Sequence, residues 1–362
     1  MLYREDAGAI NNEKIKVALA ICDSNGAYAR HVSVVMASIF ANTRSKVCVY
    51  LLHDDTLTDS NKIKLLKTAE CFEQSVELIN VQDRIGDCVP EDKRMSAGRA
   101  TYFRLLIPSL FPFDKIIYLD CDVIVNMDIA ELWHISIDDY ALAAVLDSFA
   151  FADLKGSKDF LRLNVVYKLI GIQKNCYFNA GVLLLNLRKI NRDYCFLSAV
   201  KDFFERYGKI IPFADQDFLN YVFYNDCLFI DDKFCRMDFS GIEADDVYGY
   251  ILHLICDDKP WSSYTRPYVD NLYWEYLAKT PFCENNKTLI RTLLDDICRD
   301  EFYHLHSSDC KTQYKKKIWT NLKNAHLLSF PKVLWNCMQI KYKEINQTNL
   351  LEKRYENHRN PS

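Results

Sequence analysis

The chain has few residues that interrupt regular structure and lacks the short signatures that identify many nucleotide sites. Only 10 of its 362 residues are glycine and 9 are proline. Neither G-x-G-x-x-G nor G-x-x-x-x-G-K-[ST] occurs, which excludes the dinucleotide fingerprint and the P-loop as ways of holding phosphates. The 14 cysteines include no C-x-x-C pair. This favours free, mostly buried thiols in a reducing cytosol over a zinc site or a disulfide framework.

Long apolar runs are also missing. No apolar segment approaches the roughly 20 residues that a membrane-spanning helix needs, and no apolar h-region of a signal peptide stands near the N-terminus. The hydrophobic content of 49% is nevertheless enough for a sizeable core. We therefore expect a cytoplasmic, folded protein with one large domain and an appended piece.

Charge is distributed unevenly over the chain. The net charge is −4, yet residues 308–362 hold 11 Lys and Arg against 4 Asp and Glu, a surplus of +7 that leaves −11 for residues 1–307. Trp319, Phe330 and Trp335 are interleaved with the lysines. This mixture predicts contact with an anionic membrane surface, although a basic helical cap packed on the main domain is the alternative. Nothing in the pattern predicts nucleic-acid binding.

Strand and helix patterns alternate after a loose leader at residues 1–13. The strands are expected over 16–21, 47–53, 76–78, 115–119, 141–146 and 180–187, and the helices over 28–41, 60–71, 98–106, 194–207 and 216–224. Such alternation predicts an α/β fold with a parallel or mixed sheet covered by helices. We expect a catalytic domain over residues 14–280 and a basic helical extension over residues 281–362.

The segment KIIYLDCDVIV, residues 115–125, places two carboxylates at the end of a strand that reads as buried on both faces. Side chains there emerge at the carboxyl end of the sheet, where α/β folds bind ligands. Asp120 and Asp122 are hard oxygen ligands that suit Mg²⁺ or Mn²⁺, ions that often share their coordination with a substrate phosphate. The alternative is an ordinary polar loop, because Asp is common in turns.

Other polar residues stand at the ends of apolar elements. In HLICDDKPW, His253 is a candidate third ligand and Lys259 a candidate phosphate contact, although a lone histidine is more often structural. Arg104 either neutralises a phosphate or extends towards solvent. Asn179 precedes a strand, and the ADQD segment at 214–217 begins a helix, where an N-terminal cap is the alternative for one of its acidic residues.

Taken in order, the motifs A-x-C-D-x-N, Y-F-R, Y-L-D-x-D, Y-F-N-A-G-V, D-Q-D and K-P-W resemble glycosyltransferase family 8. Within it the chain is most similar to bacterial lipopolysaccharide core hexosyltransferases, over about residues 15–280. The resemblance implies a GT-A fold with a single Rossmann-like mixed sheet, and a retaining, Mn²⁺-dependent (or Mg²⁺-dependent) transfer of glucose or galactose from a UDP-sugar to a lipopolysaccharide core hydroxyl. It also implies a peripheral position on the cytoplasmic face of the inner membrane.

The same resemblance assigns roles to individual residues. Asp120, Asp122 and His253 match metal ligands, Asp23 and Asn25 match uridine contacts, and Lys259 matches a diphosphate contact. Arg104, Asp147, Asn179 and Asp215 match residues that hold the donor sugar, and Gln216 matches the side chain nearest the anomeric carbon. An amide at that place favours front-face attack, and Asp147 or Asp215 acting as a nucleophile is the alternative.

One position departs from the family pattern. Family members usually have glycine where this chain has Cys256, followed here by Asp257 and Asp258. The added bulk and charge should weaken donor binding. A non-catalytic binding protein on the same fold therefore stays open, as does a protein or glycogen-like acceptor. A metal-dependent nucleotidyltransferase or phosphohydrolase would also use D-x-D, but it leaves Y-F-N-A-G-V and K-P-W unexplained.

Overall fold

The structure, a computed structural model, describes residues 14–90, 93, 97–148, 167–168, 170–172, 174–240, 247–255, 259–261 and 266–283. Of these, the residues up to 255 together with 272–282 form one compact unit, and 259–261, 266–271 and 283 belong to a second. The predicted leader, the loop at 256–258 and all but the first three residues of the predicted extension lie outside the described residues. The domain limits at 14, 280 and 281 stay predictions.

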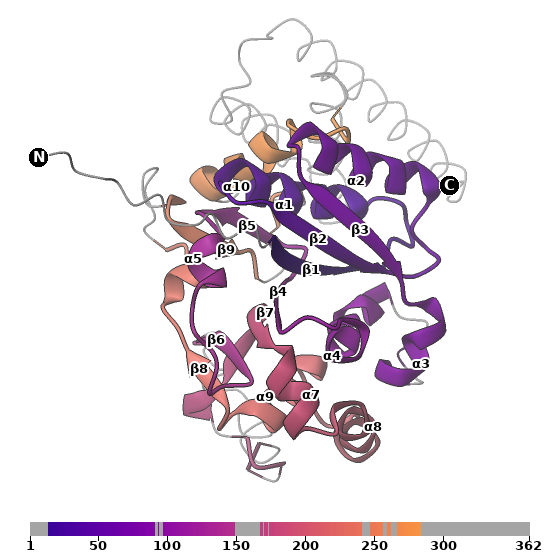
Figure 1. Ribbon diagram of the computed structural model, residues 1–362, viewed down its shortest axis with the longest axis vertical. Coiled ribbons are helices and arrows are strands. Elements are labelled where there is room, and N and C mark those ends of the chain that lie inside the picture. The colour runs from indigo at the N-terminus through magenta and orange to yellow at the C-terminus, as the bar shows by residue number, and fades with distance from the viewer. Residues whose placement is uncertain are drawn as a thin grey trace, which may run out of the picture. The chain divides into compact units, whose positions relative to one another are not determined.

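A seven-stranded mixed sheet forms the centre of the first unit, in the order β3-β2-β1-β4-β7-β6-β8 (Figure 1). Its strands are β1 (Ile15–Ile21), β2 (Val47–His53), β3 (Ser75–Asn80), β4 (Lys115–Leu119), β6 (Leu142–Leu146), β7 (Phe178–Asn186) and β8 (Cys227–Phe229). Strands β1 to β4 run parallel, whereas β7 is antiparallel to both of its neighbours. The carboxyl ends of β1 and β4 therefore lie side by side.

A second, two-stranded sheet joins β5 (Val123–Asn126) to β9 (Tyr250–His253). These strands are antiparallel, and Val123 is paired with His253. The N–H of Leu254 also donates to the carbonyl of Asp122 at 2.9 Å. The expectation of a single sheet is thus incomplete, because this small sheet ties the end of the D-x-D segment to a strand far along the chain.

Helices cover both faces of the main sheet, because successive side chains of a strand point to opposite faces. Val17, Leu19 and Ile21 of β1 pack with residues of α1 and α2, whereas Ala18 and Ala20 pack with residues of α3, η3, α4, α7, α8 and α9 (Figure 1). The α-helices are α1 (Ala29–Asn42), α2 (Asp59–Cys71), α3 (Ile85–Cys88), α4 (Ile107–Leu110), α5 (Ala130–Trp133), α7 (Leu187–Asp193), α8 (Phe196–Tyr207), α9 (Ala214–Phe223) and α10 (Pro267–Leu277). The 3₁₀ helices are η1 (Gln82–Arg84), η3 (Ala97–Leu106), η4 (Lys174–Cys176) and η5 (Asp232–Phe234).

The predicted strands and helices are present with shifts of a few residues at their ends. Thr58 caps α2 by accepting a hydrogen bond from the N–H of Asn61. The helix expected over 98–106 is instead a 3₁₀ helix, η3. The ten described cysteines form no disulfide with one another. Among the described helices none is both long and apolar enough to cross a membrane.

Candidate metal and donor site

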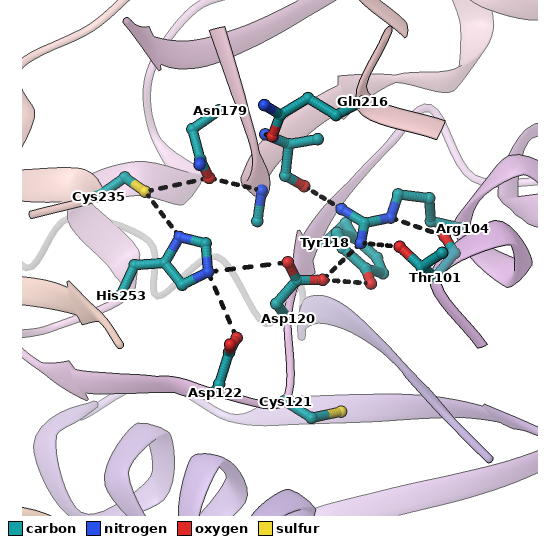
Figure 2. A network of polar contacts seen from close by, with 12 residues as sticks. Thr101, Arg104, Tyr118, Asp120, Cys121, Asp122, Asn179, Gln216, Cys235 and His253 are labelled. Atoms are coloured by element: carbon teal, nitrogen blue, oxygen red, sulfur yellow. Dashed lines mark hydrogen bonds and ion pairs between the residues drawn. The ribbon is translucent and has the colours of Figure 1, made fainter. Parts of the chain in front are cut away.

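The two aspartates of D-x-D and His253 come together at one end of the main sheet. Asp120 follows β4, Asp122 precedes β5, and His253 ends β9. The Nε2 atom of His253 lies 3.3 Å from Oδ1 of Asp122 and 3.8 Å from Oδ2 of Asp120 (Figure 2). One ligand atom from each of the three residues lies within 4.8 Å of the others. The structure therefore brings the three predicted ligands together.

This set of donors fits a divalent cation. The imidazole is buried and the two carboxylates are only half-buried. Burial by itself would lower the pKa of His253, but the charge of Asp122 and the contact with Cys235 outweigh burial and hold the pKa well above its usual value. The carboxylates thus favour a positive charge at the position of the imidazole, which a bound cation would supply. Two carboxylates and one imidazole are suitable ligands for Mn²⁺ or Mg²⁺.

Asp120 is oriented so that one of its oxygens is free to face the imidazole. Its Oδ1 atom accepts hydrogen bonds from Nη2 of Arg104 and from the hydroxyl of Tyr118, both at 2.7 Å. Its backbone N–H donates to the carbonyl of Gly181 at 2.8 Å. Because Oδ1 is held on one side, Oδ2 is the atom placed towards His253. We therefore expect Asp120 to bind a cation through a single oxygen.

Arg104 lies in the interior and is held by two carboxylates. Its Nη2 atom pairs with Asp120, and its Nε atom lies 2.9 Å from Oδ2 of Asp215. The guanidinium also donates to the carbonyls of Thr101 and Ala180. Burial would lower the pKa of Arg104, but the two aspartates outweigh burial and raise it. The side chain does not extend towards solvent, and its predicted contact with the donor remains a prediction.

Three further predicted residues form a hydrogen-bonded group beside the metal ligands. Asp147 follows β6, Asn179 lies in β7, and Gln216 lies in α9. The Oδ2 atom of Asp147 accepts hydrogen bonds from Nδ2 of Asn179 at 3.0 Å and from Nε2 of Gln216 at 3.1 Å. The Oε1 atom of Gln216 accepts from the N–H of Ala180 at 2.9 Å. The amide of Gln216 is therefore held in one orientation.

A cavity of about 520 Å³ opens beside Asp120 and Asp122. Its lining includes Asn25 and Tyr28 from the turn after β1, Thr101 and Arg104 from η3, and Asp120 and Asp122. The D-x-D carboxylates therefore face a space large enough for a small-molecule ligand.

Asp23 has a clear structural role in the turn that presents Asn25. Its Oδ1 atom accepts hydrogen bonds from the N–H groups of Tyr28 and Ala29, and its Oδ2 atom accepts from Asn61 at 2.7 Å. Asp23 is buried, whereas Asn25 is exposed and lines the cavity. Asp23 thus satisfies the first N–H groups of α1 and shapes the turn. The predicted contacts of both residues with uridine remain predictions.

The acidic residues of the ADQD segment have different roles. Asp217 accepts hydrogen bonds from the N–H of Phe213 and from the hydroxyls of Tyr167 and Tyr177, each at 2.8 Å. The capping alternative therefore applies to Asp217, whose pKa is raised to about 6 by burial. Asp215 instead pairs with Arg104 and accepts from Thr101 at 2.7 Å.

The predicted phosphate contact, Lys259, is not part of the first unit. Lys259 belongs to the second unit and is half-buried there. Cys256, Asp257 and Asp258 are outside the described residues, so the predicted weakening of donor binding by this loop stays a prediction.

Two residues around His253 were not singled out by the sequence. Cys235 places its Sγ atom 3.5 Å from Nδ1 of His253 (Figure 2). Gly181, in β7, also lies against the imidazole: a Cβ atom built at this position would be 2.2 Å from Cε1 of His253. Nothing in the local sequence signals either contact, because the residues meet only in the folded chain.

Gly181→Ala should therefore displace the imidazole. Real Cβ atoms do not approach a ring this closely, so His253 or β7 has to move, at a cost of about 1–3 kcal/mol. Urea unfolding should show this loss, and titration with Mn²⁺ should show weaker binding. In a His253→Ala background the same substitution should cost almost nothing, because the ring is gone. An equal loss of stability in both backgrounds would mean that the clash with His253 is not the cause.

Comparison with known proteins gives the same assignment as the motifs. The model for the family described as "Glycosyl transferase family 8" matches residues 19–265. A Haemophilus influenzae protein, provisionally named a glycosyltransferase, is 32% identical over 75% of this chain and 78% of its own length. General stress protein A of Bacillus subtilis is 25% identical over 75% of this chain and 96% of its own. The lipopolysaccharide 1,3-galactosyltransferase of Salmonella typhimurium is 24% identical over 75% and 80%.

A similar fold is seen in solved structures. The galactosyltransferase LgtC, solved with donor and acceptor sugar analogues, superposes with a TM-score of 0.60 at 22% identity, covering 74% of this chain and 96% of LgtC. GlyE of Streptococcus pneumoniae superposes with a TM-score of 0.52 at 23% identity, covering 73% and 61%. These likenesses show an α/β fold of the GT-A type.

Proposed function

This chain belongs to glycosyl transferase family 8, a family of retaining nucleotide-sugar hexosyltransferases, and we propose that it transfers glucose or galactose from UDP to a sugar hydroxyl. The observation that carries this proposal is the cluster of Asp120, Asp122 and His253 beside a cavity lined by both aspartates. A bound Mn²⁺ or Mg²⁺ would place the phosphates of a UDP-sugar in that cavity. We propose that Asn25 contacts the uridine and that Lys259 contacts the diphosphate.

The chemistry of the reaction suits these groups. Cleavage of the bond between sugar and diphosphate builds negative charge on the leaving phosphate, and a divalent cation supplies Lewis-acid stabilisation of that charge when bound. The protein holds the ligands in place, because Arg104 and Tyr118 fix the orientation of Asp120. Asp147, Asn179 and Gln216 form a fixed polar surface that we assign to the donor sugar.

We infer that the acceptor attacks from the front face of the sugar. The carboxylate of Asp215 is held by Arg104 and Thr101, which supports a positioning role rather than attack on the anomeric carbon. Gln216 presents an amide whose oxygen is held by the N–H of Ala180, and an amide is a poor nucleophile. Trapping a glycosylated peptide from Asp147 or Asp215 by mass spectrometry would instead establish a double displacement.

The acceptor we propose is a sugar of the lipopolysaccharide core. Two relatives are named for such substrates: the Salmonella typhimurium enzyme described above and the lipopolysaccharide 1,2-glucosyltransferase of Escherichia coli, which is 28% identical over 60% of this chain. The basic and aromatic segment at 308–362 supports binding at the cytoplasmic face of a membrane that carries such an acceptor.

A donor screen tests the function. Release of UDP from a panel of UDP-hexoses should depend on Mn²⁺, should be strongest with glucose or galactose, and should rise when a truncated lipopolysaccharide is added. A rise with a peptide or glycogen-like primer alone would reassign the acceptor. No release from any UDP-hexose with Mn²⁺ would contradict the enzymatic proposal and favour a non-catalytic binding protein.

A further inference from the structure

Cys235 is a buried thiol that contacts His253, one of the three proposed metal ligands, at the ring nitrogen facing away from Asp120 and Asp122. It follows η5 and is only 1% exposed. Its position is fixed by the main chain: the N–H of Arg236 donates to the carbonyl of Ile251, and the N–H of His253 donates to the carbonyl of Arg236, both at 2.8 Å. The segment at Arg236 thus forms a short bridge along β9, and this bridge places the thiol beside the imidazole.

The Sγ atom of Cys235 has two polar partners. It lies 3.5 Å from Nδ1 of His253 and 3.6 Å from Oδ1 of Asn179 (Figure 2). Both distances are within the range of hydrogen bonds made by sulfur. The thiol therefore links the nitrogen of His253 that faces away from the aspartates to a side chain of β7.

Asn179 determines which group donates and which accepts in the two hydrogen bonds that Cys235 makes with Asn179 and His253. Its Oδ1 atom accepts from the N–H of Gly181 at 2.8 Å, and its Nδ2 atom donates to Asp147 at 3.0 Å. Oδ1 is therefore an acceptor, and the thiol of Cys235 has to donate to it. The sulfur then accepts a hydrogen bond from Nδ1–H of His253. When a cation displaces the other ring proton, Nε2, the nitrogen facing Asp120 and Asp122, supplies its lone pair to the cation.

We propose that Cys235 is a positioning residue that holds His253 in the Nδ1–H tautomer and directs Nε2 at the divalent cation. Partners that hydrogen-bond the second nitrogen of a ligating histidine commonly contribute about 10- to 100-fold to metal affinity. This inference rests on the proposed function, because it requires that Asp120, Asp122 and His253 bind the cation.

The test compares Mn²⁺ binding in the wild-type chain and three variants, measured by the electron paramagnetic resonance signal of free Mn²⁺. Cys235→Ala removes the link, and we expect the dissociation constant to rise about 10- to 100-fold. Cys235→Ser keeps a donor and an acceptor, so it should restore binding to within about threefold. Cys227→Ala is the control: it removes a buried thiol in β8, and its Mn²⁺ affinity should match the wild type.

A second measurement reports the tautomer directly. In the ¹⁵N-labelled chain saturated with Mg²⁺, the ring nitrogens of His253 should show the Nδ1–H pattern, and Cys235→Ala should change it. An unchanged pattern together with unchanged Mn²⁺ affinity in Cys235→Ala would overturn the inference about Cys235 alone. Equal weakening in Cys235→Ala and Cys227→Ala would also overturn it. If the wild-type chain itself does not bind Mn²⁺, the proposed metal-dependent function fails as well.

Discussion

Asp122→Asn should reduce Mn²⁺-dependent release of UDP from the preferred UDP-hexose by at least about 100-fold. The Oδ1 atom of Asp122 lies 3.3 Å from Nε2 of His253, on the side of the cluster opposite Arg104. Replacing this carboxylate with an amide removes one of the two negatively charged ligands that we propose for the cation. Loss of Lewis-acid stabilisation of the leaving phosphate is worth several kcal/mol, and about 2.7 kcal/mol corresponds to 100-fold.

Two measurements separate this effect from a folding defect. Mn²⁺ should raise the thermal unfolding midpoint of the wild-type chain, because it binds only the folded state, and should raise it much less in Asp122→Asn. Asp138→Asn changes an exposed aspartate that interacts with Ser136, and it should behave as the wild type in both assays. Wild-type rates in Asp122→Asn would show that this carboxylate does not take part in the reaction.

Arg104→Met should be among the most destabilising substitutions in the first unit. The guanidinium is buried and pairs with both Asp120 and Asp215. Methionine occupies a similar volume but leaves both carboxylates without their counter-charge. Removing one partner of a buried ion pair typically costs roughly 3–5 kcal/mol, and urea unfolding at neutral pH should show a loss of this size. Arg188→Met provides the matched control, because its pair with Asp114 is exposed, and it should have little effect.

The effect of Arg104→Met should also depend on pH. Burial raises the pKa of Asp215, and Arg104 opposes that rise, so the pKa should rise further in the variant. A carboxyl group with a raised folded-state pKa favours folding below its unfolded pKa of about 3.9, and this contribution is lost as the pH rises through the folded-state value. The variant should therefore lose less stability at pH 5 than at pH 8. An equal loss at both values would contradict this account of the ion pair.

The sequence predicts the D-x-D half of the site better than the other half. The apolar run before Asp120 is a local pattern, so the strand β4 and the position of D-x-D at its carboxyl end could be predicted. The position of His253 depends on the pairing of β5, which ends at Asn126, with β9, which begins only at Tyr250. Neither hydrophobic periodicity nor turn residues specify such a distant pairing. The residues around His253 made it only a candidate ligand, with a structural histidine as the alternative, and the resemblance to a known family favoured the ligand.

Side-chain partners were also hard to predict. Arg104 was expected to meet a phosphate or solvent, yet it bridges two aspartates that lie far apart in the sequence. Asp217 could be explained by helix capping, because its partner Phe213 is local. The thiol of Cys235 resembled any other buried cysteine until the fold placed it against His253. Contacts within one element follow from sequence, whereas contacts between elements require the fold.

An anomalous difference map of crystals grown with Mn²⁺ and UDP tests the central claim most directly. The map should show one manganese peak bound by Oδ2 of Asp120, Oδ1 of Asp122 and Nε2 of His253, with the diphosphate of UDP completing its coordination. A peak bound by other side chains, or UDP bound in the cavity without manganese at these three residues, would contradict the proposed site.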